Sequence, residues 1–193
     1  ACCVCILYPG SKVVATAKRK KTIKLLITEK IEKELMNLSP NLRREIKRIN
    51  TNNNDVEVIF HNGSSFVVQP CNDDARGARS TILIVDEFRQ CDKTIIDAVF
   101  SPMEIQRQPQ YLMNPKYEHL REEPREIYLS SAYYKSHWMW QTVKDAIIGS
   151  YDGSSICISM DYAISVKHNI RSIAQMKKEK KKMSSLVFDM EYN

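Results

Sequence analysis

The residues best suited to chemistry are two adjacent carboxylates, Asp86 and Glu87, which follow an apolar run. The run, Thr81–Val85, is rich in β-branched residues and apolar on both faces, which predicts a buried strand of a parallel sheet. Acids at the carboxyl end of such a strand lie where open α/β sheets bind their ligands. One acid can then lie near Mg²⁺ while the next polarises a water, as nucleotide hydrolysis requires. The alternative is a strand that simply runs into an acidic loop.

Two arginines lie just before this strand, in the segment Arg76-Gly77-Ala78-Arg79-Ser80. A guanidinium that reaches a γ-phosphate stabilises the charge that develops during phosphoryl transfer. The two arginines are therefore candidate phosphate-facing groups. The alternative is a solvated loop with surface arginines.

A second apolar segment, Glu126–Ser131, also predicts a strand, and it ends in the small residues Ser130, Ser131 and Ala132. In motor ATPases a strand end of this kind can sense the γ-phosphate and couple hydrolysis to movement. The alternative is that the serines cap the next turn.

A glycine-rich phosphate loop is missing from the sequence. There is no G-x-x-x-x-G-K-[ST] motif, and the chain has 5 glycines in all. Such a loop would come one strand and one turn before the helix that ends near Leu7. We therefore expect a fragment that begins just after the loop and binds nucleotide poorly by itself.

Charge and composition narrow the possible partners. The net charge of +6 is compatible with a polyanion as a partner. Lys177–Lys182 is a basic run, although such runs are more often solvated helix faces.

The cysteines do not predict a metal site. Cys2-x-x-Cys5 lacks a second cysteine pair, so a zinc site is not expected. Free thiols in this number favour a reducing cytosol. No apolar run approaches the ~20 residues of a membrane helix, so no membrane partner is expected.

The elements expected to position these groups alternate between strands and helices. The pattern predicts an α/β fold whose mainly parallel sheet is flanked by helices. Asn62-Gly63 predicts a β-hairpin turn. The expected strands are 12–16, 56–60, 65–69, 81–86, 126–131 and 155–160. The expected helices are 1–8, 19–38, 93–100, 137–149, 170–182 and 184–191. The proline-containing segment 101–124 is expected to be an irregular excursion or lid.

In this order the motifs resemble the ATPase domain of tailed-bacteriophage terminase large subunits, the motors that package viral DNA. RGARSTILIVDEFRQ resembles the arginine loop, Walker B strand and catalytic glutamate of that family. IYLSSA resembles its coupling motif, and VEVIFHNGSSFVVQP resembles its hairpin. LYPGSKVVATA resembles the segment after the Walker A loop, NLSPNLRREI the end of its long helix, and KKKMSSLVFDMEYN the linker before its nuclease domain.

The resemblance implies a RecA-like P-loop NTPase sheet. It implies a partial ATPase domain over residues 1–163 and a helical linker over 164–193 that leads towards an absent nuclease domain. It implies ATP and Mg²⁺ as cofactors, and an enzyme in the full-length parent, with the fragment alone inactive.

The resemblance also implies roles for residues. Asp86 matches the Walker B aspartate that helps to hold Mg²⁺, and Glu87 matches the catalytic glutamate that polarises water. Arg76 matches the arginine that acts on a neighbouring subunit's nucleotide, with Arg79 as the alternative. The coupling motif falls on Ser130, Ser131 and Ala132.

The implied partners are double-stranded DNA, a homo-oligomeric ring of the same subunit, a portal protein and a small terminase subunit. The implied location is the host bacterial cytoplasm, transiently at the procapsid portal. Two other interpretations stay open at this point: a helicase-like DNA translocase of related fold, and a truncated module that only binds DNA or partner subunits.

Overall fold

The computed structural model describes residues 1–52, 56–75 and 77–192. The chain divides into two compact units, Ala1–Leu129 and Ser130–Asn193, which we call the sheet unit and the helical unit. Each unit is described by itself. The division between residues 163 and 164 proposed above is a functional one, and it stays a prediction.

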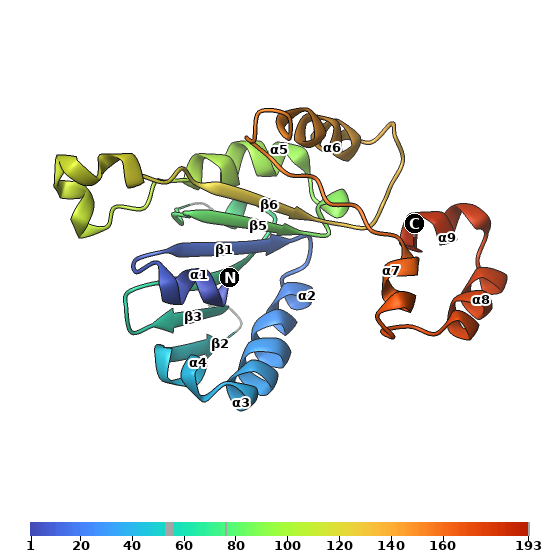
Figure 1. Ribbon diagram of the computed structural model, residues 1–193, viewed down its shortest axis with the longest axis horizontal. Helices are drawn as coiled ribbons and strands as arrows, with labels where there is room; N and C mark the ends of the chain where they lie inside the picture. The colour runs from blue at the N-terminus through green and yellow to red at the C-terminus, as the bar shows by residue number, and fades with distance from the viewer. Residues whose placement is uncertain (53–55, 76, 193) are drawn as a thin grey trace. The chain divides into compact units, whose positions relative to one another are not determined.

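The sheet unit is built on one six-stranded sheet with the order β2-β3-β4-β1-β5-β6 (Figure 1). The strands are β1 (Lys12–Ala17), β2 (Ile46–Thr51), β3 (Val56–Phe60), β4 (Ser65–Pro70), β5 (Ile82–Asp86) and β6 (Arg125–Leu129). Strands β4, β1, β5 and β6 are mutually parallel, whereas β2–β3 and β3–β4 are antiparallel pairs. The predicted α/β class with a mainly parallel sheet is confirmed.

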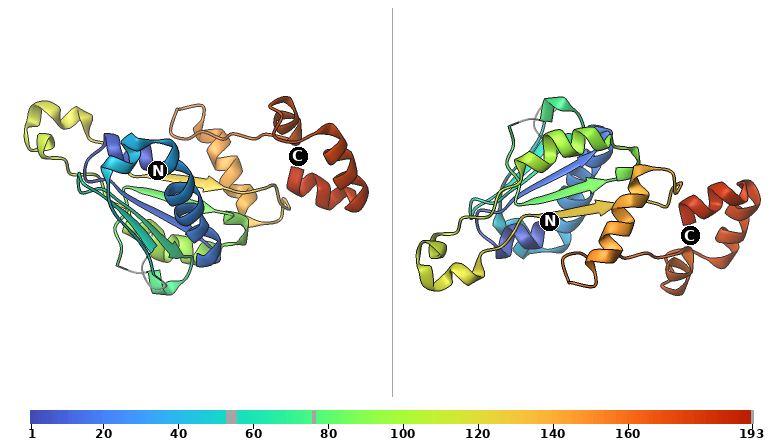
Figure 2. Two further views of the ribbon diagram at one scale, coloured as in Figure 1. Left: turned by 90° about the horizontal axis from the view of Figure 1, so that it is seen from below. Right: turned by 90° about the horizontal axis from the view of Figure 1, so that it is seen from above.

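Helices cover both faces of this sheet (Figure 2). One face carries α1 (Cys2–Leu7), α4 (Pro40–Glu45) and a long helix whose successive parts are α2 (Lys20–Leu25), η1 (Leu26–Leu35) and α3 (Met36–Leu38). The other face carries α5 (Lys93–Ile95), η4 (Ile96–Phe100) and η5 (Ser101–Met103). Because β1 lies between β4 and β5, its residues Val13 to Ala17 are all buried. The central strand thus needs the apolar character on both faces that its sequence has.

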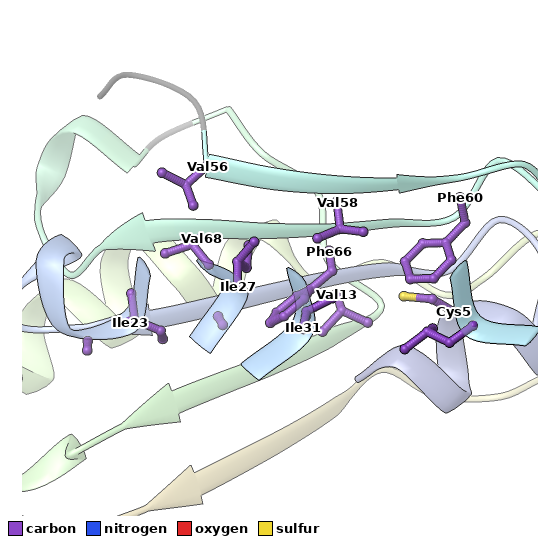
Figure 3. Packing of buried hydrophobic residues seen from close by; sticks show 13 residues of the cluster. Cys5, Val13, Ile23, Ile27, Ile31, Val56, Val58, Phe60, Phe66 and Val68 are labelled. Atoms are coloured by element: carbon purple, nitrogen blue, oxygen red, sulfur yellow. The ribbon is translucent and has the colours of Figure 1, made fainter. Parts of the chain in front are cut away.

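The main core lies between the long helix and strands β1, β3 and β4 (Figure 3). Ile23, Ile27 and Ile31 recur at helical spacing and pack against the strands. The cluster also contains buried residues of the strands and of α1, namely Cys5, Val13, Ala15, Ala17, Val56, Val58, Phe60, Phe66 and Val68. This packing fixes the position of β1 and, through it, of β5.

The predicted hairpin is confirmed in strands β3 and β4. Gly63 has φ +82°, which glycine adopts without strain. The side-chain amide nitrogen of Asn62, Nδ2, donates to the carbonyls of Cys5 and Ile6 at 2.7 and 3.1 Å. The turn therefore also fastens α1 to the sheet. Strand β2 and helix α4 were not predicted: Ser39 ends the long helix as expected, but its hydroxyl also caps α4 by accepting from the Leu42 amide.

The excursion over residues 101–124 is irregular, as predicted. After η5 it contains two further 3₁₀ segments, η6 (Gln110–Met113) and η7 (Pro115–Leu120), and no α-helix or strand among its residues.

The helical unit contains α6 (Trp138–Gly149), α7 (Tyr162–Lys167), α8 (Ile173–Lys182) and α9 (Ser185–Tyr192). Helices α6, α8 and α9 were predicted and α7 was not. The strand predicted over 155–160 is wrong: the segment has no strand partner in the described part of the unit, and Ile156 and Ile158 are 80% and 74% exposed. A segment rich in residues with high β propensity does not form a strand unless the edge of a neighbouring strand accepts its backbone hydrogen bonds. No helix among the described residues is long and apolar enough to span a bilayer.

Candidate functional site

Asp86 and Glu87 lie at the carboxyl end of β5, as the sequence predicts. Val85 pairs in register with Thr16 of β1, and Asp86 pairs with Leu129 of β6. The carboxyl ends of the three parallel strands therefore meet at one edge of the sheet. An edge of this kind binds ligands in open α/β folds, so the two acids have the position that their proposed chemistry needs.

The backbone at Glu87 is unusual. Glu87 has φ 48° and ψ 46°, the left-handed region that non-glycine residues seldom adopt, and it is followed at once by the 3₁₀ turn η3 (Phe88–Gln90). One oxygen of Asp86, Oδ1, accepts a hydrogen bond from the Glu87 amide at 3.1 Å and so braces the turn. Left-handed backbone costs about 1–2 kcal/mol for a residue with a Cβ. Such strain at the end of a central strand is typical of functional positions.

The Glu87 side chain is held only in part. Its Oε2 lies 3.3 Å from Nε of Arg89, an ion pair between residues that are 36% and 12% exposed at the side chain. The same oxygen is buried and has no hydrogen-bond partner among the described residues. The charge of this buried oxygen is balanced by the Arg89 guanidinium. Arg89 was not singled out in the sequence, although it stands only two residues after the acid.

A second contact anchors the segment that follows Glu87. The ring of Phe88 is buried and meets the ring of Tyr128 on β6 edge to face, with centroids 5.2 Å apart. The Tyr128 hydroxyl donates to Oε2 of Glu126 at 3.1 Å. Burial and the neighbouring Glu126 raise the pKa of Glu104 to about 7. The sequence offers no local signal for this group, because its members come from three separate segments.

The donor chemistry of this edge fits Mg²⁺. Asp86 and Glu87 supply hard carboxylate oxygens, and Mg²⁺ takes one or two carboxylates and completes its shell with water and phosphate oxygens. Within residues 1–52, 56–75 and 77–192, no group of three or more His, Cys, Asp or Glu side chains could enclose a metal ion.

The other predicted site residues have different outcomes. Arg76 lies outside the described residues. Arg79 is exposed. Two residues later, the backbone amide of Thr81 donates to the carbonyl of Lys12 at the start of β1. Arg79 is thus at the amino end of β5, and the strand from Ile82 to Asp86 alone spans roughly 13 Å. Arg79 and the acids are therefore not brought together within one chain.

Ser130, Ser131 and Ala132 directly follow β6 in the chain and begin the helical unit. The strand ends at Leu129, two residues earlier than predicted. Because Leu129 pairs in register with Asp86, the chain leaves the sheet at the edge that carries the acids. The roles of these three residues stay predictions.

Comparison with known proteins identifies the fold. No protein-family model matches the sequence, and no curated protein matches it. Solved structures do: the large terminase of a thermophilic bacteriophage matches with a TM-score of 0.67 over 96% of this chain, at 8% identity. The large-terminase ATPase domain of Thermus phage P74-26 matches with a TM-score of 0.62 over 99% of this chain, at 11% identity.

The chain has the fold of a phage large-terminase ATPase domain. It spans 40% of the first of these terminases and 78% of the second structure, which is an ATPase domain. A third structure, the thermophilic phage terminase in complex with ADP, matches with a TM-score of 0.61 at 8% identity, over 94% of this chain and 39% of its own length. The terminase fold that the motifs implied is therefore confirmed.

Proposed function

We propose that this chain is the ATP-hydrolysing part of a motor that translocates double-stranded DNA into a viral procapsid. The observation that carries the proposal is the pair Asp86–Glu87 at the carboxyl end of a central strand, with Glu87 held in left-handed backbone and paired with Arg89. The pair occurs in a fold shared with the large-terminase ATPase domain of Thermus phage P74-26 and with a large terminase of a thermophilic phage that was solved in complex with ADP.

Each acid has a separate role in this proposal. Glu87 accepts a hydrogen bond from the attacking water and orients it. Asp86 would hold Mg²⁺, while its Oδ1 fixes the Glu87 turn. Bound Mg²⁺ supplies charge neutralisation for the transferring phosphate. A glycine-rich loop from a longer form of the protein would cradle the remaining phosphates.

The arginines and the coupling residues complete the proposal. We assign a role in trans to Arg76, with Arg79 as the alternative, because guanidinium groups supplied by a neighbouring subunit stabilise transferred phosphate. The position of Arg79, far along β5 from the acids of its own chain, is compatible with action on another copy. Ser130, Ser131 and Ala132 are assigned to the coupling of nucleotide state to movement.

The proposed partners follow from the motor function. They are double-stranded DNA, further copies of this chain in a ring, a portal protein and a small terminase subunit. The proposed place of action is the host bacterial cytoplasm, at the portal of the procapsid during packaging.

The test is Glu87→Gln in a form of the protein that hydrolyses ATP. We expect turnover to fall by about 10²–10⁴-fold, because the amide cannot act as a general base, while nucleotide binding is retained. Turnover is measured as phosphate release and binding with a fluorescent nucleotide. Glu32→Gln, an exposed acid on η1, is the matched control and should leave turnover unchanged. Wild-type turnover in the Glu87 variant would show that the acid pair is not the catalytic site.

A further inference from the structure

The helical unit contains a hollow that is apolar inside and basic at its margin. The hollow has a volume of about 380 Å³ and lies among α7, α8 and α9. Lys167, Lys177 and Lys180 line it, and the described part of the unit adds no acidic residue to the lining. The other lining residues are apolar or aromatic, and Met176 and Phe188 are among them. The volume lies in the range of sites that accept a ligand or a partner's side chain.

Helix α8 presents one side to this hollow. Its four lining residues share that side because they follow the i, i+3, i+4, i+7 spacing. They are Ile173, Met176, Lys177 and Lys180. Met176 and Phe188 are 3% and 1% exposed and form the floor, whereas both lysines are exposed. The Lys180 ammonium lies 5.3 Å from the Phe188 ring, so its methylene stem covers apolar surface while the charge stays at the margin.

This geometry divides the basic run at the end of α8. Lys177 and Lys180 line the hollow, whereas Lys178 and Lys181, which have the same spacing, are exposed and do not line it. Lys167 adds a third positive charge from α7. Three cations around an apolar interior are complementary to an apolar group that is flanked by carboxylates.

The apolar interior decides which kind of polyanion fits. Ile173 lines the hollow and is 61% exposed, so apolar surface continues from the floor to solvent. Duplex DNA would offer phosphates to the lysines but no apolar side chain to the interior. An acidic peptide segment offers both groups. We propose that the hollow is a docking site for an acidic segment of a protein partner, which inserts one aromatic or large aliphatic side chain and places carboxylates against the three lysines.

The first test is a peptide selection. A library of random peptides displayed on phage is selected on the whole chain, and the affinities of enriched peptides are measured by fluorescence anisotropy. We expect the enriched peptides to combine a net negative charge with an aromatic or large aliphatic anchor. Absence of enrichment, or enriched peptides without an excess of acids, would overturn the proposal.

Charge reversal separates the hollow from the rest of α8. Lys177→Glu with Lys180→Glu should weaken binding of the selected peptides by about tenfold or more, because like charges then face each other. Lys178→Glu with Lys181→Glu makes the same change in net charge and should have little effect at about 0.15 M salt, where distant charges are screened. Equal losses in the two variants would indicate attraction by net charge alone and overturn the site.

A further variant tests the interior and leaves the charges unchanged. Ala163 lines the hollow but is exposed, so Ala163→Trp should occupy the space without overfilling a buried core. Binding should fall by about tenfold or more, because a buried anchor carries most of the energy of such a contact. Ala174→Trp, at an exposed residue of α8 that does not line the hollow, is the matched control. Unchanged affinity in the Ala163 variant, with its fold verified by circular dichroism, would overturn the insertion of an anchor.

Two other occupants give different outcomes. If the variant of Lys177 and Lys180 lowers the log–log salt slope of duplex DNA binding by about two units, and the variant of Lys178 and Lys181 does not, the lysines are phosphate contacts and the proposal fails. If a longer form of the protein no longer binds the selected peptides, a segment of the same protein covers the hollow, and the separate partner is excluded. None of these measurements depends on ATP turnover, so this proposal and the proposed function can fail separately.

Discussion

The sheet unit and the helical unit differ in how much apolar surface they bury. The sheet unit has a continuous apolar core on strands that are buried on both faces. Among the described residues of the helical unit, only Met176 and Phe188 are buried. An open hollow of about 380 Å³ lies among α7, α8 and α9, and Tyr162, Ile173 and Phe188 are part of its lining.

Aromatic and cationic contacts partly compensate for the small core of the helical unit. The Phe188 ring lies 5.5 Å from that of Tyr162 and 4.9 Å from that of Tyr192. The Lys180 ammonium lies 5.3 Å from the Phe188 ring and the Arg171 guanidinium 5.0 Å from the Tyr192 ring. Contacts of this kind contribute about 0.5–1.5 kcal/mol each. The comparison shows that Asp86 and Glu87 are positioned by a sheet whose central strand is buried on both faces, whereas α7, α8 and α9 meet around the single ring of Phe188.

The largest effect should come from Phe66→Ala. Phe66 is fully buried on β4 and packs into the core that fixes β1. Truncation should lower the free energy of unfolding of the sheet unit by about 3–5 kcal/mol, through lost burial and the cavity left behind. Urea unfolding measures it. Leu38→Ala, at a residue 74% exposed, is the control and should stay within about 0.5 kcal/mol of the wild type.

A smaller and more local effect is expected for Phe188→Ala. The change removes both ring contacts and the Lys180 contact, so protection of α7, α8 and α9 should fall by up to about 3 kcal/mol while the sheet unit keeps its protection. Amide hydrogen exchange read by mass spectrometry distinguishes the units. Leu186→Ala on the same helix, 53% exposed, serves as the control. Equal loss of protection in both units would show that they unfold as one, against the comparison.

A pH-dependent effect should appear in the sheet unit through Glu104→Gln. Burial, followed by the neighbouring Glu126, raises the folded pKa of Glu104 to about 7 from an ordinary value of 4.5. The neutral form is therefore favoured by folding. Its contribution to stability is complete below pH 4.5 and is lost as the pH rises through about 7.

The glutamine variant should therefore gain stability relative to the wild type as the pH rises from 5 to 8. Melting temperatures at the two pH values measure the change, and Glu118→Gln on the exposed excursion is the control. A constant difference between variant and wild type at both pH values would contradict this titration.

The smallest effect concerns DNA. Lys180, Lys181 and Lys182 end α8, and we expect their joint replacement by alanine to weaken DNA binding only modestly, because such a run is usually solvated. Binding of double-stranded DNA measured against salt concentration tests this. A loss of about three units of the log–log salt slope would make the run a principal phosphate contact and give the helical unit a larger role than we assign.

The sheet could be predicted because its signals are local. β-branched residues in Ile82–Val85, helical spacing in Ile23–Ile31 and the Asn62-Gly63 turn each determine their own element. Strand β2 escaped prediction because Lys47 and Arg48 interrupt its apolar pattern, as charges on edge strands often do. The strand prediction for residues 155–160 was wrong for the opposite reason. Their composition favours a strand, but no strand in the described part of the helical unit pairs with them.

The candidate site was predictable only where its residues adjoin in the chain. Asp86 and Glu87 are consecutive, so their placement followed from the strand. The group around Tyr128 and Glu104 depends on which strands are neighbours, and this information is not in any local pattern. Arg79 is the opposite case. It is close to Asp86 and Glu87 in the sequence, but strand β5 places it at the other end of the strand from them.

At residue 87 the side chain that is best for stability differs from the side chain that the proposed activity needs, because the backbone there is left-handed. Glycine adopts this conformation without a steric penalty, so a search for more stable variants should favour Glu87→Gly, and Asn after it. Both substitutions remove the acid that the proposed reaction needs. Selection for higher thermal stability alone would therefore yield inactive variants unless residue 87 is kept as glutamate.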